Sequence, residues 1–220
     1  MSLQAVLADL RAAEVAAQRP AGSVRLIAVS KGHSVEQIEE NIVRPGLMPA
    51  PLPLAENRGQ ELRDKQREVA ELNGRWPEVE WHFIGPIQRN KIKYLRGVSL
   101  IHTVEEDWQP AAIARAAEGW GHAPAVLLQL SNGEAQKHGV AAADLPKLHR
   151  EAQDAGLEVR GIMVMAPYGD PAAARQVFED AARHAADLGL NELSMGMSDD
   201  FTSAIAAGAT LIRIGRRLFT

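Results

Sequence analysis

Lys31 follows an unbroken apolar run, and its amine is the group in this sequence best placed to do chemistry. The run covers residues 24–30 and has the composition of a strand buried on both faces. A lysine amine can form an imine with an aldehyde or a ketone. Most lysines that follow strands are only solvated charges, so a role for Lys31 depends on which groups the fold brings near it.

Arg213 and His82 are polar residues inside apolar strands. Arg213 interrupts the run 211–214, and His82 lies between Trp81 and Phe83. A guanidinium directed into a core needs a partner, because its desolvation is otherwise costly. Arg213 could instead point outward between helices, and a lone histidine in such a strand is more often a hydrogen-bonded core residue than a catalyst.

The last two strand candidates are followed by groups suited to bind an anion. These groups are Ser194, Gly196, Gly215 and Arg216. We expect Ser198 to cap a short helix over 201–207 that Gly208 ends. Backbone N–H groups at a helix start, with a nearby arginine, bind phosphate. Together with an imine-forming amine, this predicts a phosphorylated aldehyde as the ligand; pyridoxal 5′-phosphate (PLP) and a sugar phosphate both fit.

Short apolar runs alternate with longer amphipathic stretches, and no linker divides them. Eight runs are strand candidates: 24–30, 52–55, 80–84, 100–103, 125–130, 158–165, 192–195 and 210–214. Eight strands that alternate with helices predict an α/β protein, a single (β/α)8 TIM barrel over residues 1–220. In such a barrel the polar residues that follow the strands meet at one mouth.

The second strand is the weakest of these predictions, because four prolines occur within residues 45–53 and each removes a backbone donor. Apolar residues recur at helical spacing over 141–155 and 171–188. An additional N-terminal helix over 3–18 would have to cap or flank the barrel.

Composition excludes several classes of function. A net charge of −4, with lysine and arginine spread along the chain, gives no footprint for nucleic acid or an anionic membrane. There is no cysteine, and the seven histidines lack ligand spacing, so we expect no metal site. No signal segment or apolar run of roughly 18 residues is present, and we expect a cytoplasmic protein.

Several strings, in order along nearly the whole chain, closely resemble the YggS/PROSC family of PLP-binding proteins. They are residues 28–31 (AVSK), 56–57 (EN), 81–91 (WHFIGPIQRNK), 137–139 (KHG), 193–200 (LSMGMSDD) and 212–215 (IRIG). The two longest strings are specific, unlike the single glycines. That family resembles the N-terminal barrel domain of alanine racemase, lacks its second β domain, and is implicated in PLP homeostasis without an established reaction.

The resemblance implies a role for each candidate residue. Lys31 would hold PLP as a Schiff base, Ser194, Gly215 and Arg216 would surround the phosphate, Arg213 would face the pyridine nitrogen, and Asn57, His82 and Met197 would line the ring. An arginine partner does not leave the ring nitrogen protonated, which favours holding the cofactor over amino-acid turnover. The chain departs from the family at Ala55, usually glycine, and at Arg216, usually a small hydroxyl residue.

We therefore expect a monomeric protein of PLP homeostasis, with an indirect effect on amino-acid metabolism and with PLP-dependent apoenzymes as partners. No catalytic residue is established. A racemase-like enzyme of low activity would use Lys31 with Tyr168 or His82 as a second base. A Schiff-base sugar-phosphate aldolase is a further alternative, supported only by the combination of a lysine with a phosphate site.

Overall fold

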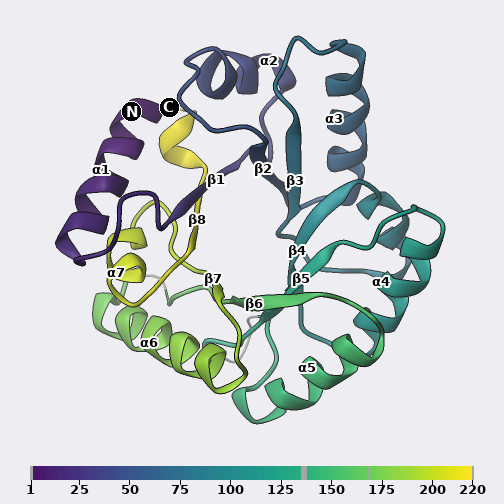
Figure 1. The fold of residues 1–220 in the computed structure, drawn as a ribbon, viewed down its shortest axis with the longest axis vertical. Helices are drawn as coiled ribbons and strands as arrows, with labels where there is room; N and C mark the ends of the chain where they lie inside the picture. The colour runs from purple at the N-terminus through teal and green to yellow at the C-terminus, as the bar shows by residue number, and fades with distance from the viewer. Residues whose placement is uncertain (1, 135–137, 168, 220) are drawn as a thin grey trace.

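The chain forms a closed barrel of eight parallel strands, in the order in which they occur in the sequence (Figure 1). The computed structural model describes residues 2–134, 138–167 and 169–219. The strands are β1 (Arg25–Val29), β2 (Leu52–Glu56), β3 (Val79–Phe83), β4 (Val98–Val104), β5 (Ala125–Gln129), β6 (Val159–Met163), β7 (Glu192–Ser194) and β8 (Leu211–Ile214). β8 pairs with β1 in parallel and closes the barrel, so the prediction of eight strands and of a (β/α)8 fold is confirmed.

Helices surround the strands (Figure 1). They are α1 (Leu3–Ala16), α2 (Val35–Ile38), α3 (Gly59–Glu71), α4 (Trp108–Glu118), α5 (Leu145–Asp154), α6 (Pro171–Asp187) and α7 (Phe201–Ala206). A π-helical turn, η1 (Glu39–Val43), extends α2, and three 3-10 segments complete the set: η2 (Arg89–Leu95), η3 (Ala142–Asp144) and η4 (Arg216–Leu218). Short 3-10 segments therefore take the place of a full helix after β3 and β8.

Side chains alternate between the barrel interior and the helix-facing side of the sheet. One apolar cluster takes residues from six strands, which only the interior allows: Ile27, Val29, Ala55, Leu100, Ala125, Leu127, Met163 and Leu211. The residues between them, such as Ala28 and Ile212, belong to the larger cluster under the helices. Because Arg213 is two residues after Leu211, its side chain points into the barrel and not outward.

β2 forms despite its prolines. Pro53 lies inside this strand at a position whose backbone faces β1. The pairing of β1 with β2 begins only at the next residue, Leu54, so the missing N–H of Pro53 breaks no hydrogen bond of the ladder.

The predicted helices are present with altered ends. A 3-10 turn precedes α5, so the α-helix itself begins at Leu145 and not at 141. The expectation that Ser198 caps the helix after β7 is wrong. α7 begins at Phe201 with Asp200 in the capping position, and the Asp200 carboxylate accepts from the Met197 N–H at 2.6 Å. The short carboxylate turns back to that amide and so fixes the 197–200 turn instead of capping the helix.

The N-terminal helix flanks the barrel beside its last elements (Figure 1). Arg19, just beyond α1, donates from Nη1 to the carbonyls of Ile205 at 3.1 Å and Ala209 at 2.5 Å. The buried carboxylate of Glu14 accepts from the backbone N–H of Gly22 and Val24. These contacts tie α1 to α7 and to the start of β1.

Candidate functional site

Lys31 lies two residues past the end of β1, where its side chain is exposed. The neighbouring strand on one side is β8, and the register brings Gly215 level with Val29. A Cβ on Gly215 would lie 3.2 Å from the Val29 carbonyl oxygen, so the two chain segments are in close contact there. The amine and the segment after β8 therefore share the mouth of the barrel, the end formed by the carboxyl ends of the strands.

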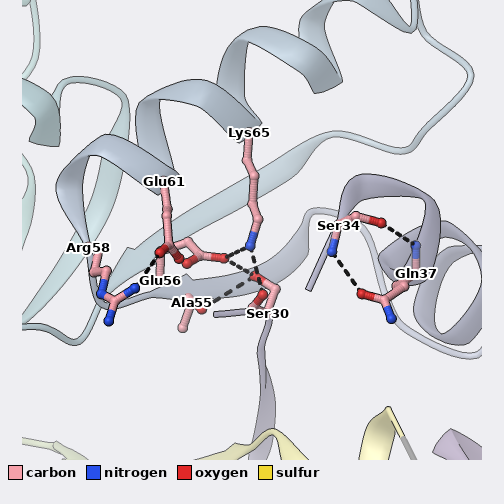
Figure 2. A network of polar contacts seen from close by, with 8 residues as sticks. All are labelled: Ser30, Ser34, Gln37, Ala55, Glu56, Arg58, Glu61 and Lys65. Carbon is pink, nitrogen blue, oxygen red and sulfur yellow. Dashed lines mark hydrogen bonds and ion pairs between the residues drawn. The ribbon is translucent and has the colours of Figure 1, made fainter. Parts of the chain in front are cut away.

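A buried ion pair on the helix side of the sheet fixes the residue before Lys31. Nζ of Lys65, on α3, donates to Glu56 Oε1 at 2.5 Å and to the Ser30 carbonyl at 2.7 Å (Figure 2). The Ser30 hydroxyl donates to the same Glu56 oxygen at 2.7 Å. We call Ser30, Glu56 and Lys65 the outer clamp. It holds both the backbone and the side chain of Ser30, and so sets where Lys31 leaves the strand.

The chain after Lys31 is also held. Ser34 begins α2 with a capping box, in which its hydroxyl accepts from the Gln37 N–H and the Gln37 side chain accepts from the Ser34 N–H (Figure 2). The ring of His33 stacks on Phe219, with centroids 3.8 Å apart. Lys31 is thus an exposed side chain on a backbone fixed from both sides.

Asn57 follows β2 and is half-buried. Gly85, after β3, packs directly against it: an added Cβ would lie 1.8 Å from the Asn57 carbonyl oxygen, so only glycine fits. A cavity of about 150 Å³ opens beside Asn57, and Gln88 and Lys91 also line it. This cavity is adjacent to the mouth, and Lys31 does not line it.

The loops after β7 and β8 lie against each other. The Arg213 N–H donates to the Gly196 carbonyl at 3.0 Å, and the exposed Arg216 pairs with Asp199. Gly196 has a φ of +93°, and a Cβ there would lie 2.7 Å from that of Ala204 in α7, which explains the glycine. Met197 is 37% exposed beside these groups.

A chain of polar side chains crosses the barrel interior beneath this mouth. Arg213 Nη1 donates to the carbonyl and the hydroxyl of Ser194, each at 2.7 Å, and its Nη2 donates to the Val164 carbonyl at 3.1 Å. Ser194 Oγ lies 2.8 Å from Nδ1 of His102, whose Nε2 lies 2.9 Å from Nδ1 of His82. All four side chains are buried.

The same chain continues to the opposite end of the barrel. Nε2 of His82 lies 3.3 Å from Oε1 of Glu80, a contact whose geometry is not that of a good hydrogen bond. Glu80 also accepts from Arg25 at the start of β1, at 2.5 Å. We call Glu80, His82, His102, Ser194 and Arg213 the interior chain.

Burial and these contacts shift three pKa values. Burial lowers the pKa of Arg213 to about 10, so the guanidinium is still charged at neutral pH. Burial, with the charge of Arg213, lowers the pKa of His102 well below its ordinary value, so this imidazole is neutral. The contact with His82, opposed by burial and reinforced by Arg25, lowers the pKa of Glu80 to about 2.

The structure brings His82, Ser194 and Arg213 together through His102, which was not among the predicted site residues. The sequence contains one indication of this position. His102 follows two apolar residues of β4 and lies two residues after Leu100, so it lies on the same interior face of the strand. His82 is fully buried beneath the mouth, with both ring nitrogens facing other residues, so it is not placed as a second base there. Tyr168 and Lys137 lie outside the described residues. The cofactor-binding roles predicted for the other residues stay predictions.

The described residues contain neither a membrane-spanning helix nor a cluster of metal ligands. Within residues 2–134, 138–167 and 169–219, no helix is long and apolar enough to cross a membrane. Over the same ranges, no three or more histidine or acidic side chains are grouped so as to hold a metal ion.

Comparison with known proteins identifies relatives over the whole chain. The family model of the alanine racemase N-terminal domain matches residues 54–220. A pyridoxal phosphate homeostasis protein of Deinococcus radiodurans is 63% identical and covers 100% of both chains, and one of Pseudomonas aeruginosa is 36% identical over 97% of this chain and 91% of its own. The solved structure of PipY from Synechococcus elongatus with PLP bound has a TM-score of 0.77 and 35% identity, covering 97% of this chain and 100% of PipY. The chain therefore belongs to the family of pyridoxal phosphate homeostasis proteins, built on the alanine racemase N-terminal domain.

Proposed function

We propose that this protein binds PLP as a Schiff base on Lys31 and acts in PLP homeostasis, with an indirect effect on amino-acid metabolism. One observation carries the proposal: the exposed Lys31 amine shares the barrel mouth with the guanidinium of Arg213, which is buried near the carboxyl end of β8. A guanidinium only donates hydrogen bonds, so it fits a ligand with a nitrogen or oxygen acceptor. The PLP-bound structure of PipY supports PLP as that ligand.

Lys31 would supply the covalent bond. Its Nζ would condense with the cofactor aldehyde, forming a C=N bond and releasing one water. The outer clamp contributes by fixing the backbone at Ser30, so that the side chain of Lys31 always starts from the same position at the end of β1. Bound PLP supplies an electrophilic aldehyde and a ring that acts as an electron sink.

Arg213 would limit what the ring can do. A guanidinium that stays charged cannot accept a proton, so it would donate to the pyridine nitrogen and leave that nitrogen unprotonated. The electron sink is then weak compared with a site that has a carboxylate partner. This supports a protein that holds PLP rather than one that turns over amino acids.

The remaining predicted residues would line the site. Ser194, Gly215 and Arg216 are expected around the phosphate, and Arg216 would share its charge between the phosphate and Asp199. Asn57, Met197 and His82 are expected along the ring. We further expect a monomeric cytoplasmic protein that exchanges PLP with apoenzymes, which size-exclusion chromatography and transfer assays can test.

The direct test is to trap the Schiff base. The purified full chain is mixed with PLP, its absorbance is followed, and the adduct is reduced with borohydride and mapped by peptide mass spectrometry. We expect a stoichiometric mass increase on the peptide that contains Lys31, and its loss in Lys31→Arg, which keeps the charge but cannot form the imine.

Lys147→Arg is the matched control, because Lys147 is an exposed lysine on α5 far from β1 in the sequence. It should leave the label on Lys31 unchanged. A label on another lysine, or none at saturating PLP, would contradict the proposal.

A further inference from the structure

The interior chain joins two groups whose hydrogen-bonding roles are fixed. The guanidinium of Arg213, near the carboxyl end of β8, can only donate. The carboxylate of Glu80, near the start of β3, can only accept at neutral pH, since the pKa of this group is about 2. Ser194 and the two histidines between them can each donate and accept. The interior chain runs from the mouth to the floor, which is the end where the strands begin. It passes from Ser194 on β7 to His102 on β4, two strands that are not neighbours in the barrel (Figure 1).

With both imidazoles neutral, one direction of hydrogen bonding satisfies Ser194 and His102 and turns the hydrogen of His82 toward the Glu80 carboxylate. Ser194 accepts from Arg213 and donates its own hydrogen to Nδ1 of His102. His102 then donates from Nε2 to Nδ1 of His82, and His82 carries its hydrogen on Nε2, facing Glu80. Both imidazoles are therefore the Nε2–H tautomer.

The opposite direction leaves two unfavourable contacts. His82 would turn the lone pair of Nε2 toward the Glu80 carboxylate, 3.3 Å away. The hydrogen of Ser194 would also have no acceptor within the chain, because both His102 and Arg213 would donate to its oxygen. A buried polar group left without a partner in this way is unfavourable.

We propose that Glu80, at the floor of the barrel, fixes the direction of the interior chain and thereby the hydrogen-bonding state of Ser194 and Arg213 beneath the mouth. Glu80 is a positioning residue, because it acts through His82 and His102 and does not reach the mouth. The consequence for PLP rests on the proposed function, whereas the tautomers themselves do not.

The tautomers are measured by long-range ¹H–¹⁵N NMR of the imidazoles in ¹⁵N-histidine-labelled protein without cofactor. His82→Asn and His102→Asn assign the two signals by their loss. We expect both wild-type rings to be neutral Nε2–H forms. Either ring in the Nδ1–H form, or a charged His102, would overturn the proposal without any further variant.

Three variants test the role of Glu80. Glu80→Leu removes the carboxylate and leaves only the hydrogen of Ser194 to oppose the reverse direction, so Nδ1–H forms of both rings should appear. Glu80→Gln keeps a carbonyl acceptor and should keep the wild-type tautomers. Arg25→Gln removes the other partner of Glu80 and should also keep them. Glu78→Gln, an exposed acid two residues earlier, is the matched control. Unchanged tautomers in Glu80→Leu would overturn the proposal.

Titration with PLP tests whether the change reaches the mouth. The dissociation constant of Glu80→Leu should differ from that of wild type by roughly three- to tenfold, the size of one hydrogen bond, and that of Glu80→Gln by less than about twofold. Reversed tautomers with an unchanged dissociation constant would overturn the coupling to the site. If wild type binds no PLP, the proposed function fails, while the tautomer result still decides the direction of the chain.

Discussion

The outer clamp and the interior chain bury polar groups on opposite sides of the same sheet, by different means. The clamp on the helix side is an ion pair, Glu56 with Lys65, whose Nζ and Oε1 are 2.5 Å apart. The interior chain places two imidazoles and a hydroxyl between its charged ends. The clamp therefore depends on charge balance, and the interior chain depends on the direction of its hydrogen bonds.

Because of this difference, the outer clamp and the interior chain should respond differently when one of their members is removed. Removing one member of an ion pair leaves an uncompensated charge, so the clamp should fail as a unit. Removing one of the uncharged members of the interior chain leaves neutral neighbours that can reorient, and the loss should be smaller. The clamp suits fixing a backbone, and the interior chain suits passing a hydrogen-bonding state across the barrel.

The largest effect is expected from Lys65→Met. It leaves Glu56 buried with no cation, and its Oε2 already lacks a partner among the described groups, so the free energy of unfolding should fall by about 3–5 kcal/mol. Urea denaturation at pH 7 measures it. Lys147→Met, which removes an exposed pair with Glu151, should cost less than about 0.5 kcal/mol.

The double variant Glu56→Gln with Lys65→Met separates charge from packing. It should be more stable than Lys65→Met alone, because no buried charge remains. A double variant as unstable as the single one would mean that packing of the lysine stem, and not charge balance, holds the clamp.

Ser194→Ala should have the next largest effect, a loss of about 1–3 kcal/mol in the free energy of unfolding. It leaves Nδ1 of His102 without its partner and removes one acceptor from Arg213. Denaturation is again the measurement. A loss as large as that of Lys65→Met would contradict the distinction between the two regions.

The pH dependence of stability isolates His102. Folding lowers the pKa of His102 below its ordinary value of 6.5. As the pH falls below 6.5, the unfolded state therefore binds a proton at this residue and the folded state does not. Stability should therefore drop between pH 7 and pH 5, by at most about 2 kcal/mol from this residue. The drop should shrink in His102→Gln. The lowered pKa of Glu80 acts separately, since its stabilisation is lost between about pH 4.5 and pH 2.

The smallest effect is expected from Asp199→Ala, which removes the exposed ion pair with Arg216. The free energy of unfolding should change by less than about 1 kcal/mol, and the difference should vanish at high salt. A salt-independent loss would show that this surface pair behaves like the buried clamp.

Much of the fold could be predicted because the strands are buried on both sides. Their apolar runs are continuous, and alternation then places Arg213 inside once Leu211 is recognised as an interior residue. The least certain strand formed because Pro53 lies outside the β1 ladder, a fact of register that sequence does not contain.

The site could be predicted only in part. Residues that follow strands, such as Lys31, can be recognised in the sequence because they are polar groups at the ends of apolar runs. The contacts of His102 cannot be predicted in this way, because its partners Ser194 and His82 lie on other strands and the sequence does not give the stagger of those strands across the barrel. Lys65 in turn resembles any charged residue of an amphipathic helix, and only the packing of α3 on β1 and β2 shows that it is buried.

The contacts of Arg19 set an order of events during synthesis. Arg19 emerges early, yet its acceptor carbonyl on Ala209 lies 190 residues further along the chain. At roughly 5–20 residues per second, translation of that interval takes on the order of 10–40 s. Until then α1 has no α7 to dock against, so its apolar stripe of Leu3, Val6 and Leu10 stays open on the ribosome. The nascent barrel therefore cannot close, and α1 cannot dock, until the last elements of the chain have been made.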